Sequence, residues 1–88
     1  MTVEYSKKFL KYFRKRILPK SSLVKRFEQR LKLFKTDVSN PLLKDHSLTG
    51  EKIGFRAFSV TGDIRIIYKM IDDIAIFYDI GTHNQVYK

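Results

Sequence analysis

The chain has 88 residues, of which 18 are Lys or Arg and nine are Asp or Glu, so its net charge is +9. This length suits a single domain over residues 1–88 with one modest core. The lack of cysteine excludes disulfides and thiolate metal sites and fits the cytoplasm, and no apolar run approaches the roughly 20 residues of a membrane span.

The charge is concentrated in the first part of the chain. Residues 1–36 carry 12 basic and two acidic side chains, a net charge of +10, whereas residues 37–88 have a net charge of −1. A field of one sign over half of a small domain attracts a polyanion such as nucleic acid, or an acidic protein. The alternative is a solvated helix surface that keeps the domain soluble. The charge alone leaves both interpretations open.

The N-terminal pattern predicts a short strand followed by a helix. Residues Thr2–Tyr5 fit a strand. Phe9, Phe13 and Ile17 then recur every four residues, which is the spacing of one helical face. Ser6 precedes this stripe and is suited to cap the helix.

A second helix is predicted after a short connection. Pro19 ends the first helix, and apolar residues from Leu23 to Phe34 form the buried side of the next. Ser21 or Ser22 is suited to cap it. Two helices so closely connected predict a helical hairpin.

The rest of the chain predicts a loop and a three-stranded sheet. The segment SNPLLKDHSLTGEKIG, residues 39–54, contains a proline and two glycines, so we expect a loop that places His46 outside any regular element. The segments FRAFSV, DIRIIYKMI and IAIFYDI are strand-like and are separated by the pairs TG and DD. They predict an antiparallel meander, and the whole chain therefore predicts an α+β fold.

The first two strands of the meander can be assigned faces if Thr61 and Gly62 form a two-residue turn, because directly opposed residues share a face. One face is then almost wholly apolar: Phe55, Ala57, Ser59, Ile64, Ile66, Tyr68 and Met70. The other face is mixed: Arg56, Phe58, Val60, Asp63, Arg65, Ile67 and Lys69. We expect the apolar face to pack on the helices and the mixed face to form a charged groove.

Two histidines, His46 and His83, are the candidates for proton transfer near neutral pH. Metal-independent RNA cleavage needs a base for the 2′-hydroxyl, an acid for the leaving 5′-oxygen, and cations that stabilise the transition state. His46 and His83 suit these proton transfers together with Asp63. The structural alternatives are surface histidines and an aspartate that serves only the turn beside Gly62.

Cationic and aromatic residues complete this candidate RNA site. Arg56 and Arg65 suit phosphate through their planar donor forks, and Lys69 shares their predicted face. Tyr87 suits stacking on a base of single-stranded RNA. Structural ion pairs and packing on the sheet edge are the alternatives. The sequence shows no phosphate-binding loop and no metal-ligand spacing, so we assign neither a cofactor nor a metal.

Four segments, in order over Lys44–Tyr87, carry a resemblance to a known family: KDHSLTG, GFRAFSV, DIRIIYKM and IGTHNQVY. The pattern resembles the RelE/ParE superfamily of bacterial toxins in its YafQ-like branch. The resemblance implies two helices packed on a twisted antiparallel sheet in the order β-α-α-β-β-β. It also implies an mRNA interferase, an endoribonuclease toxin of a type II toxin-antitoxin system, which cuts mRNA at the ribosome and is neutralised by a cognate antitoxin.

The resemblance also implies residue roles. His46, Asp63 and His83 match the catalytic positions of the YafQ-like branch, and Arg65 matches the arginine of a recurring R-x-x-Y motif. Tyr87 stands where the family usually has Phe.

The chain departs from the pattern at Ala57 and Ser59, where some YafQ-like toxins carry Asp and His. The predicted faces turn both residues toward the helices. This departure favours one alternative, a non-catalytic RNA- or antitoxin-binding module. A second alternative is a ParE-like gyrase poison that acts by binding, but such a protein needs neither the paired histidines nor Asp63.

The last nine residues, IGTHNQVYK, are part of the predicted site. We expect Gly81 to free the backbone so that His83 turns toward the groove, and we expect order up to about Tyr87.

Overall fold

The computed structural model describes residues 1–87. Its elements in chain order are β1 (Thr2–Tyr5), α1 (Lys7–Arg16), α2 (Ser21–Thr36), β2 (His46–Ser47), the 3₁₀ turn η1 (Gly50–Lys52), β3 (Arg56–Ser59), β4 (Ile64–Ile71), β5 (Ile74–Thr82) and α3 (His83–Val86). The expected α+β fold and its β-α-α-β-β-β order are confirmed, and β2 and α3 are additions to them.

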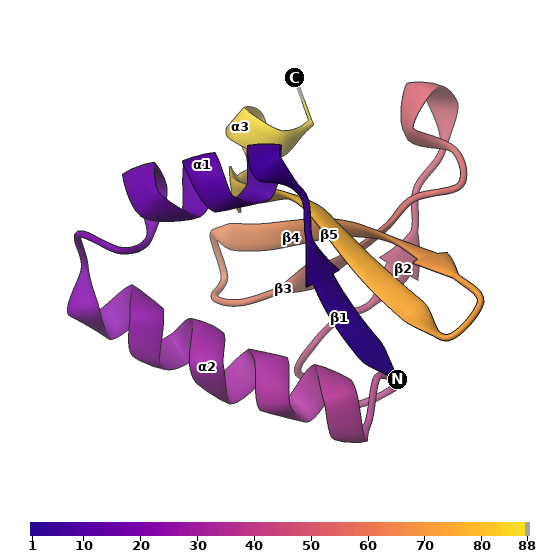
Figure 1. Ribbon diagram of the computed structural model, residues 1–88, viewed down its shortest axis with the longest axis horizontal. Helices are drawn as coiled ribbons and strands as arrows, with labels where there is room; N and C mark the ends of the chain where they lie inside the picture. The colour runs from indigo at the N-terminus through magenta and orange to yellow at the C-terminus, as the bar shows by residue number, and fades with distance from the viewer. Residues whose placement is uncertain (88) are drawn as a thin grey trace.

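The strands form one five-stranded sheet in the order β1-β5-β4-β3-β2 (Figure 1). The helical hairpin carries the chain from β1 at one edge to β2 at the other, and the meander returns it to β5. As a result β5 runs parallel to β1, while the other neighbours are antiparallel. The sheet is therefore mixed, which corrects the expectation of a purely antiparallel one.

The helix starts follow from local hydrogen bonds. Ser6 caps α1 as expected, since its Oγ accepts the backbone N–H of Phe9 at 3.0 Å. The expected serine cap of α2 is wrong, because Ser21 is already helical and Lys20 is the N-cap without a side-chain bond. The connection between α1 and α2 is a tight turn, in which the Lys20 N–H donates to the Ile17 carbonyl at 2.9 Å. The second helix can therefore begin at Ser21.

An aromatic cluster joins the helices to one face of the sheet. Phe34 of α2 is fully buried, and its ring centroid lies 4.6 Å from that of Phe58 and 4.9 Å from that of Tyr68. Phe77 of β5 contacts Phe34 and also Phe9 of α1. Aromatic pairs at these separations add to the free energy of simple burial. This face therefore holds the main core.

The register of β3 on β4 differs from the expected one by one residue. Phe58 pairs with Ile66, and the Val60 N–H donates to the Ile64 carbonyl at 2.8 Å, so three residues rather than two form the loop. The cause is Thr61, whose Oγ1 accepts the N–H groups of Asp63 at 3.1 Å and of Ile64 at 3.0 Å.

This shift reverses the expected faces of β3 and leaves those of β4 unchanged. Ile66 lies in the core as expected, but so do Phe58 and Val60, which were assigned to the groove. Ala57 lies on the opposite face, where it packs with Ile67. The expected common face of Arg56 and Arg65 is wrong for the same reason.

The second face of the sheet carries a smaller core beneath α3. Val86 of α3 is buried against Ala57 and Ile67, with Leu48 and Phe55 at the margin. The C-terminal segment is thus packed on the sheet (Figure 1). Within residues 1–87, none of the helices has the length and hydropathy needed to cross a membrane.

Replacing Phe34 by alanine is expected to lower the free energy of unfolding by about 3–5 kcal/mol, because it opens a cavity between α2 and the sheet. Urea denaturation measures the loss. The control is Leu18→Ala, which removes a side chain that is 54% exposed and should cost less than about 1 kcal/mol. Equal losses in the two variants would contradict the central place of Phe34 in the core.

Candidate active site

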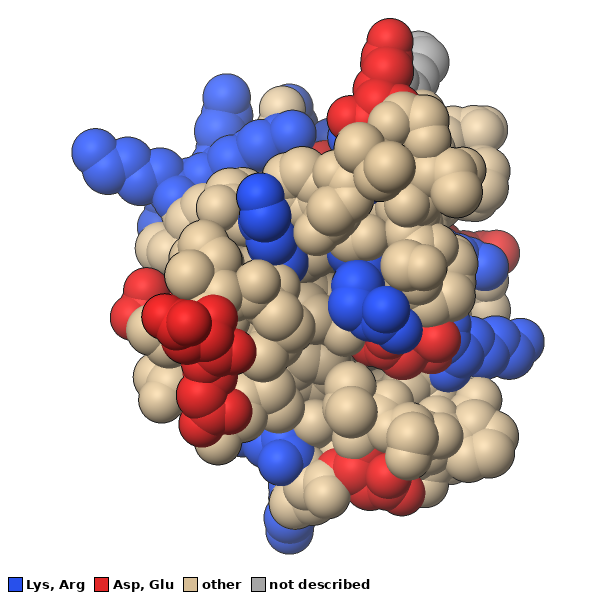
Figure 2. Space-filling view, turned by 90° about the vertical axis from the view of Figure 1, so that its right-hand side faces the viewer, with Lys and Arg blue, Asp and Glu red and all other residues tan. Residues whose placement is uncertain are grey.

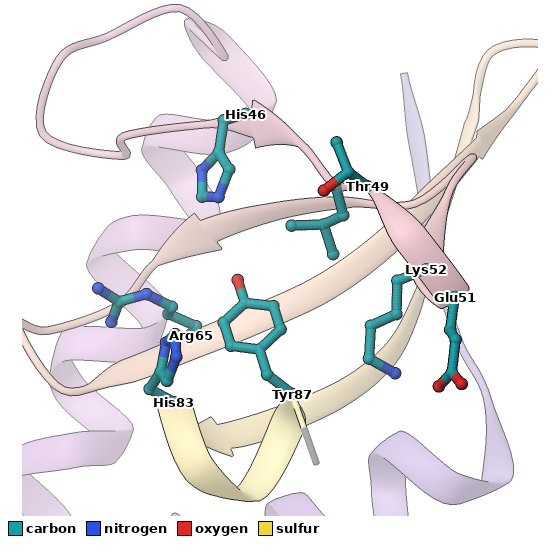
Figure 3. A pocket seen from close by; sticks show the side chains of 8 residues that line it. His46, Thr49, Glu51, Lys52, Arg65, His83 and Tyr87 are labelled. Carbon is teal, nitrogen blue, oxygen red and sulfur yellow. The ribbon is translucent and has the colours of Figure 1, made fainter.

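A hollow of about 580 Å³ opens on the second face of the sheet beside α3 (Figure 3). Its walls come from β2 and the following loop, from β4, and from the C-terminal segment. The lining residues are His46, Leu48, Thr49, Glu51, Lys52, Arg65, His83 and Tyr87. Four residues predicted from the sequence are thus brought together, and a loop adds the others.

His46 belongs to β2, so the expectation that it lies outside regular structure is wrong. It pairs with Ala57 at the edge of the sheet. Its Nδ1 lies 2.9 Å from the Lys44 carbonyl, which can only accept, so Nδ1 carries a proton. The lone pair of the neutral ring is then on Nε2. His46 is exposed, and its ring is directed at the hollow (Figure 3).

A partly buried polar cluster holds the segment just before His46. The carboxylate of Asp45, with a side chain only 7% exposed, accepts from Arg56 Nε at 2.7 Å and Nη2 at 2.6 Å, and also from the hydroxyl of Tyr68. Hydrogen bonding to Asp45 raises the pKa of Arg56. Burial, and then Asp45, raises the pKa of Tyr68 well above its ordinary value. Arg56 therefore anchors this segment and does not line the hollow.

Arg65 is the arginine that reaches the hollow. It projects from β4 opposite Ser59 and Gly81, and its Nη1 donates to the Gly62 carbonyl at 3.0 Å. This bond steadies the guanidinium and leaves its other N–H groups available to a ligand.

Asp63 and Lys69 do not line the hollow. Asp63 is exposed in the β3–β4 loop, one residue before β4. Lys69 lies farther along β4, with its Nζ 5.5 Å from the centre of the Phe55 ring. The prediction that Lys69 shares a face of the sheet with Arg65 is confirmed. Lys69 nevertheless lies too far along β4 to line the hollow.

A capping box orders the turn that carries His83. Thr82 Oγ1 accepts from the Gln85 N–H at 3.3 Å, and Gln85 Oε1 accepts from the Thr82 N–H at 2.8 Å. Gly81 acts differently from the expectation, since a Cβ there would lie 2.6 Å from Gln85 Oε1 and 2.7 Å from Arg16 Nη1. Its role is close approach within β5, not a turn.

Tyr87 follows α3, and its ring centroid lies 4.5 Å from that of His83. Its hydroxyl is buried without a hydrogen-bond partner among residues 1–87 and points into the hollow (Figure 3). Burial raises the pKa of Tyr87, while the charge of Arg65 acts in the opposite direction. A buried hydroxyl without a partner destabilises the protein, so a polar ligand atom in the hollow would be stabilised there.

The loop residues Thr49, Glu51 and Lys52 were missed by sequence reasoning. Gly50 has a φ of 68° and Gly54 a φ of 91°, and these left-handed conformations let the chain turn between β2 and β3. The two glycines were the available signal, but they indicated only a loop. Within residues 1–87, no three or more His, Asp or Glu side chains are grouped as a metal site would require.

Two histidines, an arginine and a tyrosine hydroxyl thus surround one hollow on the side of the sheet away from α1 and α2. Such a set can move protons at two positions and hold an anionic group between them. The fold is the one that the resemblance to the RelE/ParE superfamily implied.

The chain belongs to the YafQ family. The family described as "bacterial toxin of type II toxin-antitoxin system, YafQ" matches residues 1–88. The expected YafQ-like branch is therefore confirmed. No curated protein sequence matches the chain significantly.

Solved toxin structures are similar over nearly the whole chain. A metal-bound toxin from Helicobacter pylori is 27% identical, with 98% of each chain covered and a TM-score of 0.77. YafQ from E. coli strain BL21(DE3) is 25% identical, with 98% of this chain and 97% of that one covered and a TM-score of 0.75. YafQ in the E. coli DinJ–YafQ complex is 26% identical, with 98% and 97% covered and a TM-score of 0.73.

Replacing Tyr68 by phenylalanine is expected to reduce the loss of stability at alkaline pH. Folding raises the pKa of Tyr68 above its value of about 10 in the unfolded chain. The stability that the protonated hydroxyl contributes is therefore complete below about pH 10 and is lost as the pH rises further. Between about pH 8 and about pH 11, wild type should lose about 1 kcal/mol more than Tyr68→Phe. Urea denaturation at both pH values measures the free energy of unfolding. Equal losses in wild type and variant would contradict the raised pKa of Tyr68.

Proposed function

We propose that the single domain of residues 1–88 is an mRNA interferase, a metal-independent endoribonuclease that cleaves mRNA at the ribosome. The observation that carries the proposal is the hollow in which His46, His83 and Arg65 meet. Membership of a family of type II toxins supports it. Because the substrate is translated mRNA, the activity belongs to the cytoplasm.

In the proposed reaction, His46 Nε2 removes the proton of the ribose 2′-hydroxyl. The 2′-oxygen attacks the adjacent phosphorus, and the bond from phosphorus to the 5′-oxygen breaks. Protonated His83 supplies a proton to that leaving oxygen. The products are a 2′,3′-cyclic phosphate and a 5′-hydroxyl. Assigning the base to His46 rests on its Nδ1–H, which is held by the Lys44 carbonyl.

Arg65 and the hydroxyl of Tyr87 complete the proposed site by binding the oxygens of the transferring phosphate. Charge-assisted bonds from a guanidinium fork are suited to the dianionic transition state. Tyr87 is positioned by its ring contact with His83, so its hydroxyl can donate without further ordering. Asp63 is proposed to orient His83, since Ile64, the residue after Asp63, pairs with Thr82, the residue before His83.

The proposed partners are a cognate antitoxin and the ribosome. E. coli YafQ forms a complex with DinJ, which supports an antitoxin partner for this chain. The net charge of +10 over residues 1–36 lies mainly on α1 and α2 and would steer the protein toward ribosomal RNA. On the side seen in Figure 2, by contrast, acidic groups are interspersed with Lys and Arg.

The reaction can be tested by inducing the protein in bacteria and mapping mRNA 5′ ends. Cuts in phase with codons are expected for wild type, and His83→Gln should slow cleavage by about 100-fold or more through loss of the proton donor. Leu18→Ala removes an exposed, uncharged side chain that does not line the hollow and is the control. Growth arrest with intact mRNA and damaged DNA would contradict the nuclease and favour a gyrase poison.

Replacing Tyr87 by phenylalanine tests two effects of its hydroxyl separately, one on the stability of the free protein and one on binding of the transition state. Removing a hydroxyl that is buried without a partner among residues 1–87 should stabilise the free protein by about 1 kcal/mol. Cleavage should nevertheless fall about tenfold, because a hydrogen bond to the transition state is lost. Thermal unfolding and single-turnover cleavage measure the two effects. Unchanged cleavage in a stabilised variant would remove Tyr87 from the proposed reaction.

A further inference from the structure

A β-bulge in β5 places an aromatic side chain beside the proposed active site. Ile67 pairs with Asp79 and Tyr68 pairs with Phe77, so Tyr78 is the extra residue between two consecutive pairs. Phe77 lies in the main core, whereas the ring of Tyr78 meets Phe55 on the other face of the sheet. Ile80, three residues after Phe77, also lies in the main core, so the bulge shifts the alternation of side chains along β5 by one residue.

Tyr78 belongs to a second, smaller hollow of about 110 Å³. Its lining residues are Lys8, Lys52, Phe55, Ile67, Tyr78 and Asp79. Lys52 also lines the larger hollow that contains both histidines, so the two hollows share a wall. An RNA strand bound in the larger hollow could therefore extend into the smaller one.

The smaller hollow has the walls of a stacking site. The rings of Tyr78 and Phe55 meet edge to face, with centroids 5.2 Å apart and planes at 85°. Both side chains are only half-buried, so part of each ring remains accessible. Ile67, which is 3% exposed, adds an apolar wall. Bases of single-stranded RNA bind to such aromatic surfaces without needing base-specific hydrogen bonds.

The charges around this hollow suit a phosphate beside the stacked base. Among residues 1–87, neither Lys52 nor Lys69 has a carboxylate within 4.0 Å. The carboxylate that lines this hollow, Asp79, is paired with Lys8 at 3.5 Å and with Arg16 at 3.4 Å. An incoming phosphate thus meets cations that are not already committed to ion pairs.

We infer that the smaller hollow binds a nucleotide of the mRNA that flanks the scissile phosphate. Its base stacks on Tyr78, and the phosphate that links it to the cleaved nucleotide is bound by Lys52. This inference rests on the proposed function, since it extends the same RNA strand out of the active site. Tyr78 is a positioning residue, because it touches neither the 2′-hydroxyl nor the leaving oxygen.

The first test is single-turnover cleavage of mRNA on programmed ribosomes, with the toxin concentration varied. Tyr78→Ala should raise the half-saturating concentration about tenfold, with a smaller effect on the maximal rate. Tyr78→Phe keeps the ring and should restore wild-type saturation. Lys52→Gln should also weaken saturation, while Leu18→Ala, which removes an exposed and uncharged side chain between α1 and α2, should not. Thermal unfolding of each variant confirms that it is folded.

The second test identifies the nucleotide by removing its base. Each nucleotide next to the scissile bond is replaced in turn by an abasic one, which keeps the phosphate. At one position the change should raise the half-saturating concentration about tenfold for wild type and have almost no effect for Tyr78→Ala.

The outcomes separate the two proposals. If wild type cleaves mRNA but Tyr78→Ala saturates like wild type, or no abasic position depends on Tyr78, the stacking site is overturned and the nuclease stands. If wild type cleaves no mRNA at all, the proposed function fails and the inference fails with it.

Discussion

The three-residue turn closed by Thr61 sets the register on which the site depends. By accepting the N–H groups of Asp63 and Ile64, its hydroxyl pairs Phe58 with Ile66. That register places the Phe58 ring against Phe34 in the core and turns the alternate residues of β3 to the other face. A shift of one residue would exchange every side chain of β3 between core and groove.

The same register explains how the two histidines come to face each other. Because Arg56 lies on the face of Tyr68, both can bind Asp45, and that cluster holds the chain as it enters β2 and His46. At the other end of the sheet, the capping box of Thr82 turns the chain into α3 and carries His83. The arrangement tolerates a destabilising feature, the buried hydroxyl of Tyr87, which has no hydrogen-bond partner among residues 1–87.

Local patterns predicted much of this structure, and the error in β3 arose where a side-chain hydrogen bond set the length of a turn. The helical stripe of Phe9 and Phe13 and the cap at Ser6 were correct, since each depends on residues within one turn. The prediction of which face each side chain of β3 occupies is wrong, because hydrogen bonds to the Thr61 side chain lengthen the turn by one residue. Ala57 and Ser59 consequently lie on the groove face, with Ala57 beneath Val86 and Ser59 opposite Arg65, so the departure from the family pattern falls beside the site.

The sequence by itself determined the α+β class, the family, and the side chains able to transfer protons, since periodicity, motifs and residue chemistry are all local properties. Only the tertiary structure decided which of them meet. It brought His46, Arg65, His83 and Tyr87 to one hollow, committed Arg56 to Asp45, and left Asp63 in an exposed loop. The bonds that close the turn at Thr61 and the capping box at Thr82 are local, but their consequence for the site depends on the pairing of β3, β4 and β5, which joins residues far apart in the chain.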